Sequence, residues 1–299
     1  MSESISPFID LKALSEPVCK LIEAVQSAAG VVYEPTQIRR KAKADADALI
    51  IKLKGEIEHQ EIALRAAERI NKRDVRRQQN IEKIVANAVQ QLPETVSKEK
   101  VDEDWTTQFF EYCQDVSNEE MQSLWAKLLA GEVALPGSYS LRTLHTVKLM
   151  RKKDADLFTK FCSYVWGDEE HKALVHLHTA ATNGLLFSRG LSFEEKLHLQ
   201  TIGLIQMEGS ITIPENEPVT TTYFSKKYNL TLKSDSFKAK LNRFNGARVV
   251  PYFKVDADFL TETGKELALI CGANADEDYL NSFIESLSNE YISATLLDD

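Results

Sequence analysis

One stretch of the chain constrains its fold more than any other. Residues 36–92 contain no proline and a single glycine, Gly55, and they are rich in Ala, Lys, Arg, Glu and Gln. These residue types favour helix, and the two strongest helix breakers are almost absent. The sequence therefore predicts one long helix that ends at Pro93. A break can be accommodated at 71–80, where Val75 is the one apolar residue.

An apolar stripe runs along this predicted helix. Its side chains recur at steps of three and four, which places them on one helical face. The stripe is narrow and rich in alanine, so it suits the packing of helix on helix in a coiled coil. Fully helical, 36–92 would be about 85 Å long, more than a monomer of this size can cover. We therefore expect a homo-oligomer held together through Leu49, Leu53, Ile57 and Leu64.

Charge is distributed unevenly along the chain. The formal net charge is −9, yet residues 36–92 hold 13 Lys and Arg against 8 Asp and Glu. A basic face of this kind could contact the phosphates of nucleic acid, an anionic membrane surface, or acidic helices of the same assembly. No aromatic residues are interleaved, so stacking of single-stranded bases is not indicated. The candidate contact residues are Arg39 and Arg40 in one cluster, and Arg69, Lys72, Arg73, Arg76 and Arg77 in another.

Three further segments complete the predicted organisation. We expect an N-terminal amphipathic helical segment at 1–35, a helical core domain at 93–167 and a small α+β C-terminal module at 168–299. Together with the long basic helix at 36–92, these make a mainly α protein.

The N-terminal segment contains one clear helix signal. Pro17 suits the first turn of a helix capped by Ser15. Such a helix could pack on its own protein or lie in a membrane interface. The chain shows neither a secretory signal nor an apolar run of membrane-spanning length, so we expect a cytoplasmic protein, with a peripheral place at the inner membrane left open. The apolar face of the helix holds Val18, Leu21, Ile22, Val25 and Ala29.

The helical core domain has the most strongly specified interior. Asp102 can cap its first helix, and Ser117 and Glu120 form a capping box at the start of the second. We expect the interior to form around Trp105, Trp125 and Phe158.

The C-terminal module has the order of a known small domain. A short helix at 193–201 precedes Gly203-Leu204-Ile205, β-like segments follow, and another helix begins near Leu260. This order is similar to the second half of a winged-helix domain. The insertion between the two halves is long, and the sequence shows no evident recognition helix.

Motifs that would indicate catalysis are missing from the sequence. The chain has no phosphate-binding loop, no nucleophile elbow and no zinc-protease motif. His171, His176 and His178 form one His-rich cluster, but a second pair of ligands at a suitable spacing is lacking. Acidic pairs such as Glu119 and Glu120 lie at helix starts, where they offset the helix dipole. We therefore expect no metal, no cofactor and no enzymatic activity.

Several motifs stand out along the chain: Tyr33-Glu34-Pro35-Thr36, Leu124-Trp125-Ala126-Lys127-Leu128-Leu129-Ala130, Pro136-Gly137-Ser138-Tyr139, Gly203-Leu204-Ile205 and Leu260-Thr261-x-x-Gly264. Together they resemble a family of bacterial proteins known as a domain of unknown function. One of them, the Leu-Trp-Ala core, is also similar to the phage abortive-infection alpha family. That local similarity implies phage defence, with a phage-encoded trigger, and it supplies no catalytic residues.

Three functions remain open at this point. The favoured one is a non-enzymatic bacterial antiviral protein of the abortive-infection kind, which acts by assembling through its long helix. The alternative is a nucleic-acid-binding regulator that uses the basic helix and a degenerate winged helix. An enzyme of unrecognised type is the third.

Overall fold

The computed structural model describes the chain in two compact units, residues 1–149 and 150–299. The described residues are 15–29, 60–167, 173–176, 180–215, 217–233, 252–289 and 292–297. Helix is the commoner element, and two small antiparallel sheets lie in the second unit, so the fold is α+β with a helical majority. None of the described helices combines the length and the apolarity needed to cross a membrane.

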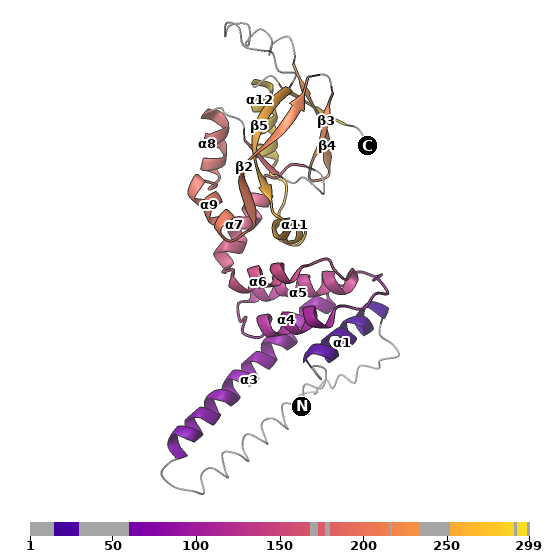
Figure 1. The fold of residues 1–299 in the computed structure, drawn as a ribbon, viewed down its shortest axis with the longest axis vertical. Coiled ribbons are helices and arrows are strands. Elements are labelled where there is room, and N and C mark those ends of the chain that lie inside the picture. The colour runs from indigo at the N-terminus through magenta and orange to yellow at the C-terminus, as the bar shows by residue number, and fades with distance from the viewer. Residues whose placement is uncertain are drawn as a thin grey trace, which may run out of the picture. The chain divides into compact units, whose positions relative to one another are not determined.

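The first unit is helical. Its described elements are α1 (Glu16–Ala29), α3 (Gln60–Val89), α4 (Glu103–Cys113), α5 (Glu119–Ala134) and α6 (Leu141–Leu149). Helix α5 contacts both α1 and α3, and α4 contacts α1 and α6. Figure 1 shows the N-terminal half of α3 extending beyond the bundle that α4, α5 and α6 form.

Helix α3 confirms part of the predicted long helix. It is continuous from Gln60 to Val89, so the break considered at 71–80 does not occur. The reason is that this polar stretch consists largely of helix-forming Lys, Arg and Gln, and its end is anchored by Asn80, whose amide donates to the Gln114 carbonyl at 2.9 Å. The last turns of α3 then bury Ile81, Ile84, Val85 and Ala88. Residues 36–59 lie outside the described part of the chain.

Aromatic packing forms the interior of the first unit. Phe109 stacks on Trp105 and meets Trp125 edge-on, with ring centroids 5.2 Å apart in both pairs. The indole N–H of Trp105 donates to the Tyr139 carbonyl at 2.7 Å. The predicted interior at Trp105 and Trp125 is therefore confirmed.

The N-terminal cap of α4 agrees with the sequence prediction, and that of α5 differs from it. Asp102 caps α4 by accepting from the Trp105 N–H at 2.8 Å, as expected. Helix α5 is capped by Asn118, which accepts from the Met121 N–H, so the capping box at Ser117 was placed one residue too early. Asn is as good a cap as Ser, and sequence spacing alone does not separate adjacent candidates.

Helix α1 packs on its own protein. Leu21, Ile22 and Val25 are buried, and the helix contacts α4 and α5. The apolar face that a membrane contact would require is thus occupied within the first unit. Removal of residues 1–33 would take away α1 and expose the facing side of α4 and α5. Such a deletion should therefore destabilise the rest of the first unit.

The second unit begins earlier than the predicted boundary at 167/168. Helix α7 (Lys152–Cys162) belongs to this unit, and with it Phe158, which was expected in the same interior as Trp125. Asp154 on α7 bonds to His198 at 2.9 Å, so α7 is held by residues that follow it in the chain. The other elements are β1 (Ala173–His176), α8 (Ala180–Ser188), α9 (Phe193–Thr201), β2 (Ile205–Pro214), β3 (Val219–Tyr223), β4 (Lys226–Leu232), β5 (Tyr252–Leu260), α11 (Glu262–Ala268), α12 (Glu277–Asn289) and β6 (Ile292–Leu296).

Two three-stranded antiparallel sheets make up the β structure of this unit. The first has the strand order β1-β5-β2 and the second the order β3-β4-β6. Strands β2 and β5 are far apart in sequence but pair over most of their length, with a bulge between Gln206 and Gly209. The β3–β4 hairpin is therefore an insertion between the two longest strands of the first sheet.

A close backbone contact joins α11 to the start of β2. A Cβ atom on Gly264 would lie only 2.1 Å from the Leu204 carbonyl oxygen, so a larger residue is excluded there. The Thr261 hydroxyl donates to the Gly203 carbonyl at 2.7 Å and accepts from the Gly264 N–H. The two C-terminal motifs of the sequence thus meet in one structural contact.

We predict that Trp125→Ala lowers the free energy of unfolding by about 3–5 kcal/mol, because Trp125 is fully buried and its removal leaves a large cavity. Urea titration measures the change. Leu135→Ala, at the exposed C-terminal end of the same helix, is the control and should cost less than about 0.5 kcal/mol. Equal effects of the two substitutions would show that Trp125 does not support the interior.

Candidate functional site

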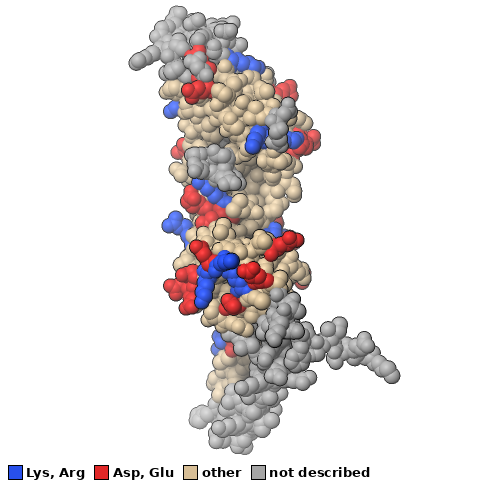
Figure 2. Space-filling model, turned by 90° about the vertical axis from the view of Figure 1, so that its right-hand side faces the viewer, with Lys and Arg blue, Asp and Glu red and all other residues tan. Residues whose placement is uncertain are grey.

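The surface of α3 carries a line of cations. We call Arg65, Arg69, Lys72, Arg73 and Arg76 the basic stripe; together with Glu68 they line one shallow groove along the helix. Their spacing of three and four residues places them on one face, and the stripe is about 16 Å long at 1.5 Å per residue. Charge is mixed on the face of the molecule that Figure 2 shows, where acidic and basic groups lie side by side.

The cations of the basic stripe differ in how they are engaged. Arg65 pairs with Glu61 at 3.4 Å and Arg73 with Asp74 at 2.9 Å, and all four side chains are largely exposed. Exposed pairs of this kind hold their charges only weakly. Within the described part of the chain, Arg69 and Lys72 make no ion pair or hydrogen bond. The middle of the stripe is therefore available for an external anion.

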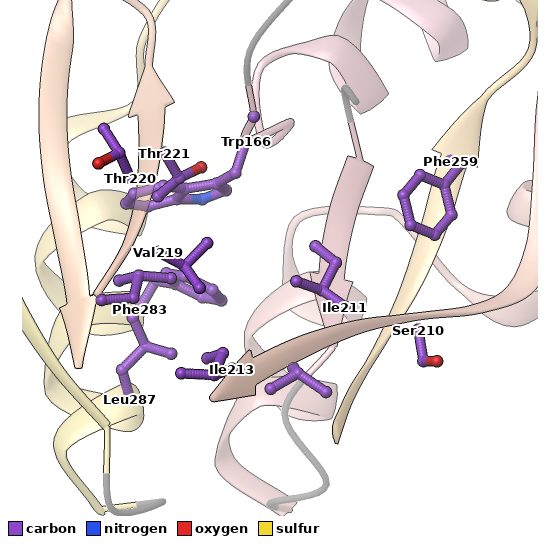
Figure 3. Close-up of a pocket in the computed structure, with 13 residues that line it drawn as sticks. Trp166, Ser210, Ile211, Ile213, Val219, Thr220, Thr221, Phe259, Phe283 and Leu287 are labelled. Carbon is purple, nitrogen blue, oxygen red and sulfur yellow. The ribbon is translucent and has the colours of Figure 1, made fainter. Parts of the chain in front are cut away.

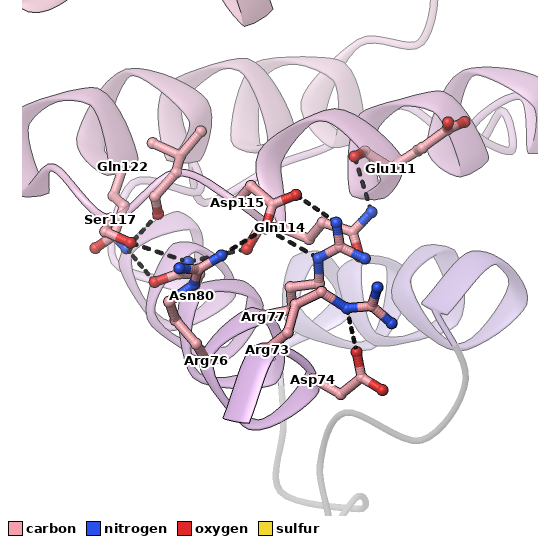
Figure 4. A network of polar contacts seen from close by, with 11 residues as sticks. Arg73, Asp74, Arg76, Arg77, Asn80, Glu111, Gln114, Asp115, Ser117 and Gln122 are labelled. Atoms are coloured by element: carbon pink, nitrogen blue, oxygen red, sulfur yellow. Dashed lines mark hydrogen bonds and ion pairs between the residues drawn. The ribbon is translucent and has the colours of Figure 1, made fainter. Parts of the chain in front are cut away.

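Arg77 is engaged inside the protein and does not contribute to anion binding along the stripe. Its guanidinium donates to both carboxylate oxygens of Asp115, at 2.9 and 2.6 Å, and Arg76 reaches the same carboxylate at 3.2 Å (Figure 4). The hydrogen bond from Arg77 is the main reason that the pKa of Asp115 lies below its ordinary value, and the same bond raises the pKa of Arg77. Arg77 thus attaches α3 to the segment between α4 and α5.

A neighbouring amide network continues this attachment. Asn80 donates to the Gln114 carbonyl, while Gln122 on α5 donates to Asn80 at 3.2 Å and to the Val116 carbonyl at 2.8 Å (Figure 4). Asn80 and Gln122 are both buried, so these bonds satisfy polar groups that would otherwise be costly to bury. The stripe therefore stands on a helix whose far end is firmly fixed.

The structure brings together only part of the predicted site. Arg69, Lys72, Arg73 and Arg76 line one groove of α3. Arg77, which helical spacing would place near the same face as Arg69, Arg73 and Arg76, serves an internal contact with Asp115. Leu64 is half-buried on α3. The other candidates, Arg39, Arg40, Leu49, Leu53 and Ile57, lie outside the described residues.

Sequence reasoning missed two residues of this region. Arg65 continues the stripe four residues before Arg69, so the helical spacing could have identified it. Asp115 pairs with residues 38 and 39 positions earlier, and no local pattern indicates that contact.

No metal centre is found among the described residues, where no group of three or more His, Cys, Asp or Glu side chains is placed to hold an ion. His176 ends β1 opposite Asp256 of β5, while His171 and His178 lie outside the described part.

The Leu-Trp-Ala motif of α5 lies in the interior of the first unit. Trp125, Ala126, Leu128 and Leu129 are all fully buried. Glu132, which follows the motif, is buried too and accepts hydrogen bonds from the N–H groups of Gly137 and Tyr139 at 2.7 and 3.0 Å. These residues hold α5 and the turn after it in place, so the packing of this chain accounts for the motif.

We predict that acid weakens the contribution of Asp115 to stability. A carboxyl with a lowered pKa in the folded chain stabilises the fold above its unfolded pKa, and this stabilisation is lost as the pH falls through the folded pKa. The difference in free energy of unfolding between the parent and Asp115→Asn should therefore be constant from about pH 7 to about pH 5 and shrink below about pH 4.

Urea titrations at several pH values measure this difference. Asp74→Asn is the matched control, because Asp74 pairs with the adjacent Arg73 and joins no second helix. Its effect should be small at every pH. A difference for Asp115→Asn that grows in acid would contradict the prediction.

Comparison with known proteins gives one result. The family described as Protein of unknown function (DUF2806) matches residues 64–284, from α3 into α12. Neither the curated proteins nor the solved structures give a match. The matched residues include the stripe, the buried α5 motif and the contact between Gly264 and Leu204, and they make up most of the chain. The chain belongs to the DUF2806 family, which confirms its resemblance to a domain of unknown function.

Proposed function

We propose that this protein is a non-catalytic binding protein that holds the phosphate backbone of a nucleic acid along the basic stripe of α3. The observation that carries the proposal is the availability of Arg69 and Lys72, which lie at the centre of a line of cations and have no partner among the described residues. Phosphates neutralised by such cations release counterions, which drives binding. The basic stripe is positively charged, whereas the chain as a whole has a net charge of −9.

The composition of the stripe favours a linear polyanion over a membrane. The six residues that line its groove are all charged. Helices that lie in a membrane interface place Trp, Phe or Leu close to their cations, so that apolar side chains enter the lipid. Base stacking also needs aromatic side chains, which the groove lacks among its lining residues. We therefore favour contact with a duplex backbone.

We further infer that residues 152–260 form a winged helix with a large insertion. The order α7, β1, α8, α9, β2, β5 and the sheet order β1-β5-β2 support this interpretation. Helix α9 would then occupy the position of the recognition helix. Its exposed side chains include Phe193 (61% exposed), Leu197 (45% exposed) and Glu194, which suit a protein contact better than phosphates. Nucleic-acid binding is accordingly assigned to α3.

The direct test removes the two available cations. In Arg69→Ala/Lys72→Ala, affinity for a labelled DNA duplex should fall, and the slope of log K against log salt should decrease in magnitude by about 1.8, because each lost phosphate contact accounts for about 0.9. Fluorescence anisotropy over a salt series measures both quantities. Lys98→Ala/Lys100→Ala makes the same change in net charge at exposed positions outside α3, and it should leave the slope unchanged.

A gain-of-function variant sharpens this test. Asp115→Asn removes the carboxylate that Arg76 and Arg77 share, so it should tighten DNA binding and steepen the salt slope. Binding of anionic vesicles but not DNA by the parent would contradict the proposal in favour of lipid. Dissociation of an oligomer in Arg69→Ala/Lys72→Ala, with no DNA binding by the parent, would assign the stripe to a contact between copies.

Self-association through the long helix stays a prediction of the sequence. Replacing Leu49, Leu53 and Ile57 by Asp should lower the molar mass measured by light scattering, because charges would interrupt the apolar stripe. An unchanged molar mass in a folded variant would contradict self-association through the long helix. The antiviral role also stays a prediction, since it depends on a motif that is buried in the interior of the first unit.

A further inference from the structure

A cavity of about 280 Å³ lies between the two sheets of the second unit. Strands β2 and β5 provide one wall, with Ile211, Ile213 and Val255. The inserted hairpin and α12 provide the other, with Val219 and Phe283 (Figure 3). Trp166 lies beside the strand β3 residues at one end. The cavity is partly open to solvent, since Ser210 and Thr220 in its lining are exposed, so a ligand can enter it from outside.

The lining is largely apolar. None of the described residues that line the cavity is Asp, Glu, Lys, Arg or His, so a charged ligand would lose its hydration without compensation. One polar group stands out on β3. The Thr221 hydroxyl makes no hydrogen bond within the described part of the chain. The neighbouring Thr220 hydroxyl donates to the Asn229 side chain on β4 at 2.9 Å.

The volume sets the size of a suitable ligand. An apolar cavity of about 150 Å³ accommodates benzene, which has six non-hydrogen atoms. By proportion, a cavity of 280 Å³ accommodates about a dozen. That is the size of a two-ring aromatic compound with one small substituent.

We propose that this cavity is a binding site for a neutral, largely apolar molecule of about a dozen non-hydrogen atoms, with one hydrogen-bonding group directed at Thr221. The apolar walls from both sheets bury the body of the ligand, and the Thr221 hydroxyl fixes its orientation. The site is distinct from the basic stripe, which lies in the first unit. The proposal is therefore independent of nucleic-acid binding.

The experiment uses the full chain with 2-naphthol and naphthalene as probes, measured by isothermal titration calorimetry. The parent should bind both at one site. Thr221→Val keeps the shape of the side chain but removes its hydroxyl, so 2-naphthol should bind up to about tenfold more weakly while naphthalene binds equally well. Thr220→Val is the matched control and should change neither affinity, because that hydroxyl is engaged with Asn229.

A second pair of variants fills the cavity. Ile211→Trp on one wall, or Val219→Phe on the other, should abolish binding of both probes while the melting temperature stays at or above that of the parent, because a void is filled. The second variant serves if the first fails to fold. Failure of the parent to bind either probe, or unchanged binding in a folded variant with a filled cavity, would overturn the proposal.

Discussion

Burial of helix α5 is the constraint on which the first unit depends. The helix is surrounded by neighbours, with α1 and α3 packed directly against it and Phe109 of α4 against its Trp125. Polar side chains on a helix buried in this way are costly unless they are hydrogen-bonded. Gln122 does so with Asn80 of α3, and Glu132 does so with the backbone of the turn that leads to α6. The position of α3, and hence of its basic stripe, therefore follows from the polar bonds that α5 requires.

Local signals in the sequence predicted much of the helical structure. The helix at 193–201 and the cap at Asp102 were predicted correctly because both depend on residues close in sequence. The unit boundary was misplaced because α7 looks like a further amphipathic helix of the core, whereas its partner His198 lies 44 residues away from Asp154. Strands β1 and β6 were also missed, since each is short and pairs with a strand far away in the sequence. Strand β4 could have been found, because the buried residues Tyr228, Leu230 and Leu232 alternate along it.

The basic stripe could be predicted from helical spacing, but its available centre could not. Six similar cations, those of the basic stripe and Arg77, look equivalent in sequence. Asp115 forms ion pairs with Arg76 and Arg77. Glu61 pairs with Arg65, and Asp74 pairs with Arg73. What distinguishes Arg69 and Lys72 is that they make no ion pair within the described part of the chain, although Glu68 lies beside them. Sequence spacing does not show which pairs form.

The cavity between the sheets has a consequence for how the second unit holds together. Its two walls come from different stretches of the chain, the long strands β2 and β5 and the hairpin inserted between them. A molecule bound by both walls adds its binding free energy to the adhesion of the sheets, and it does so in proportion to the logarithm of its concentration. The insertion would then separate from the first sheet more readily when the molecule is scarce. Occupancy of one small site would thus change the free energy that holds the inserted hairpin and α12 against the first sheet.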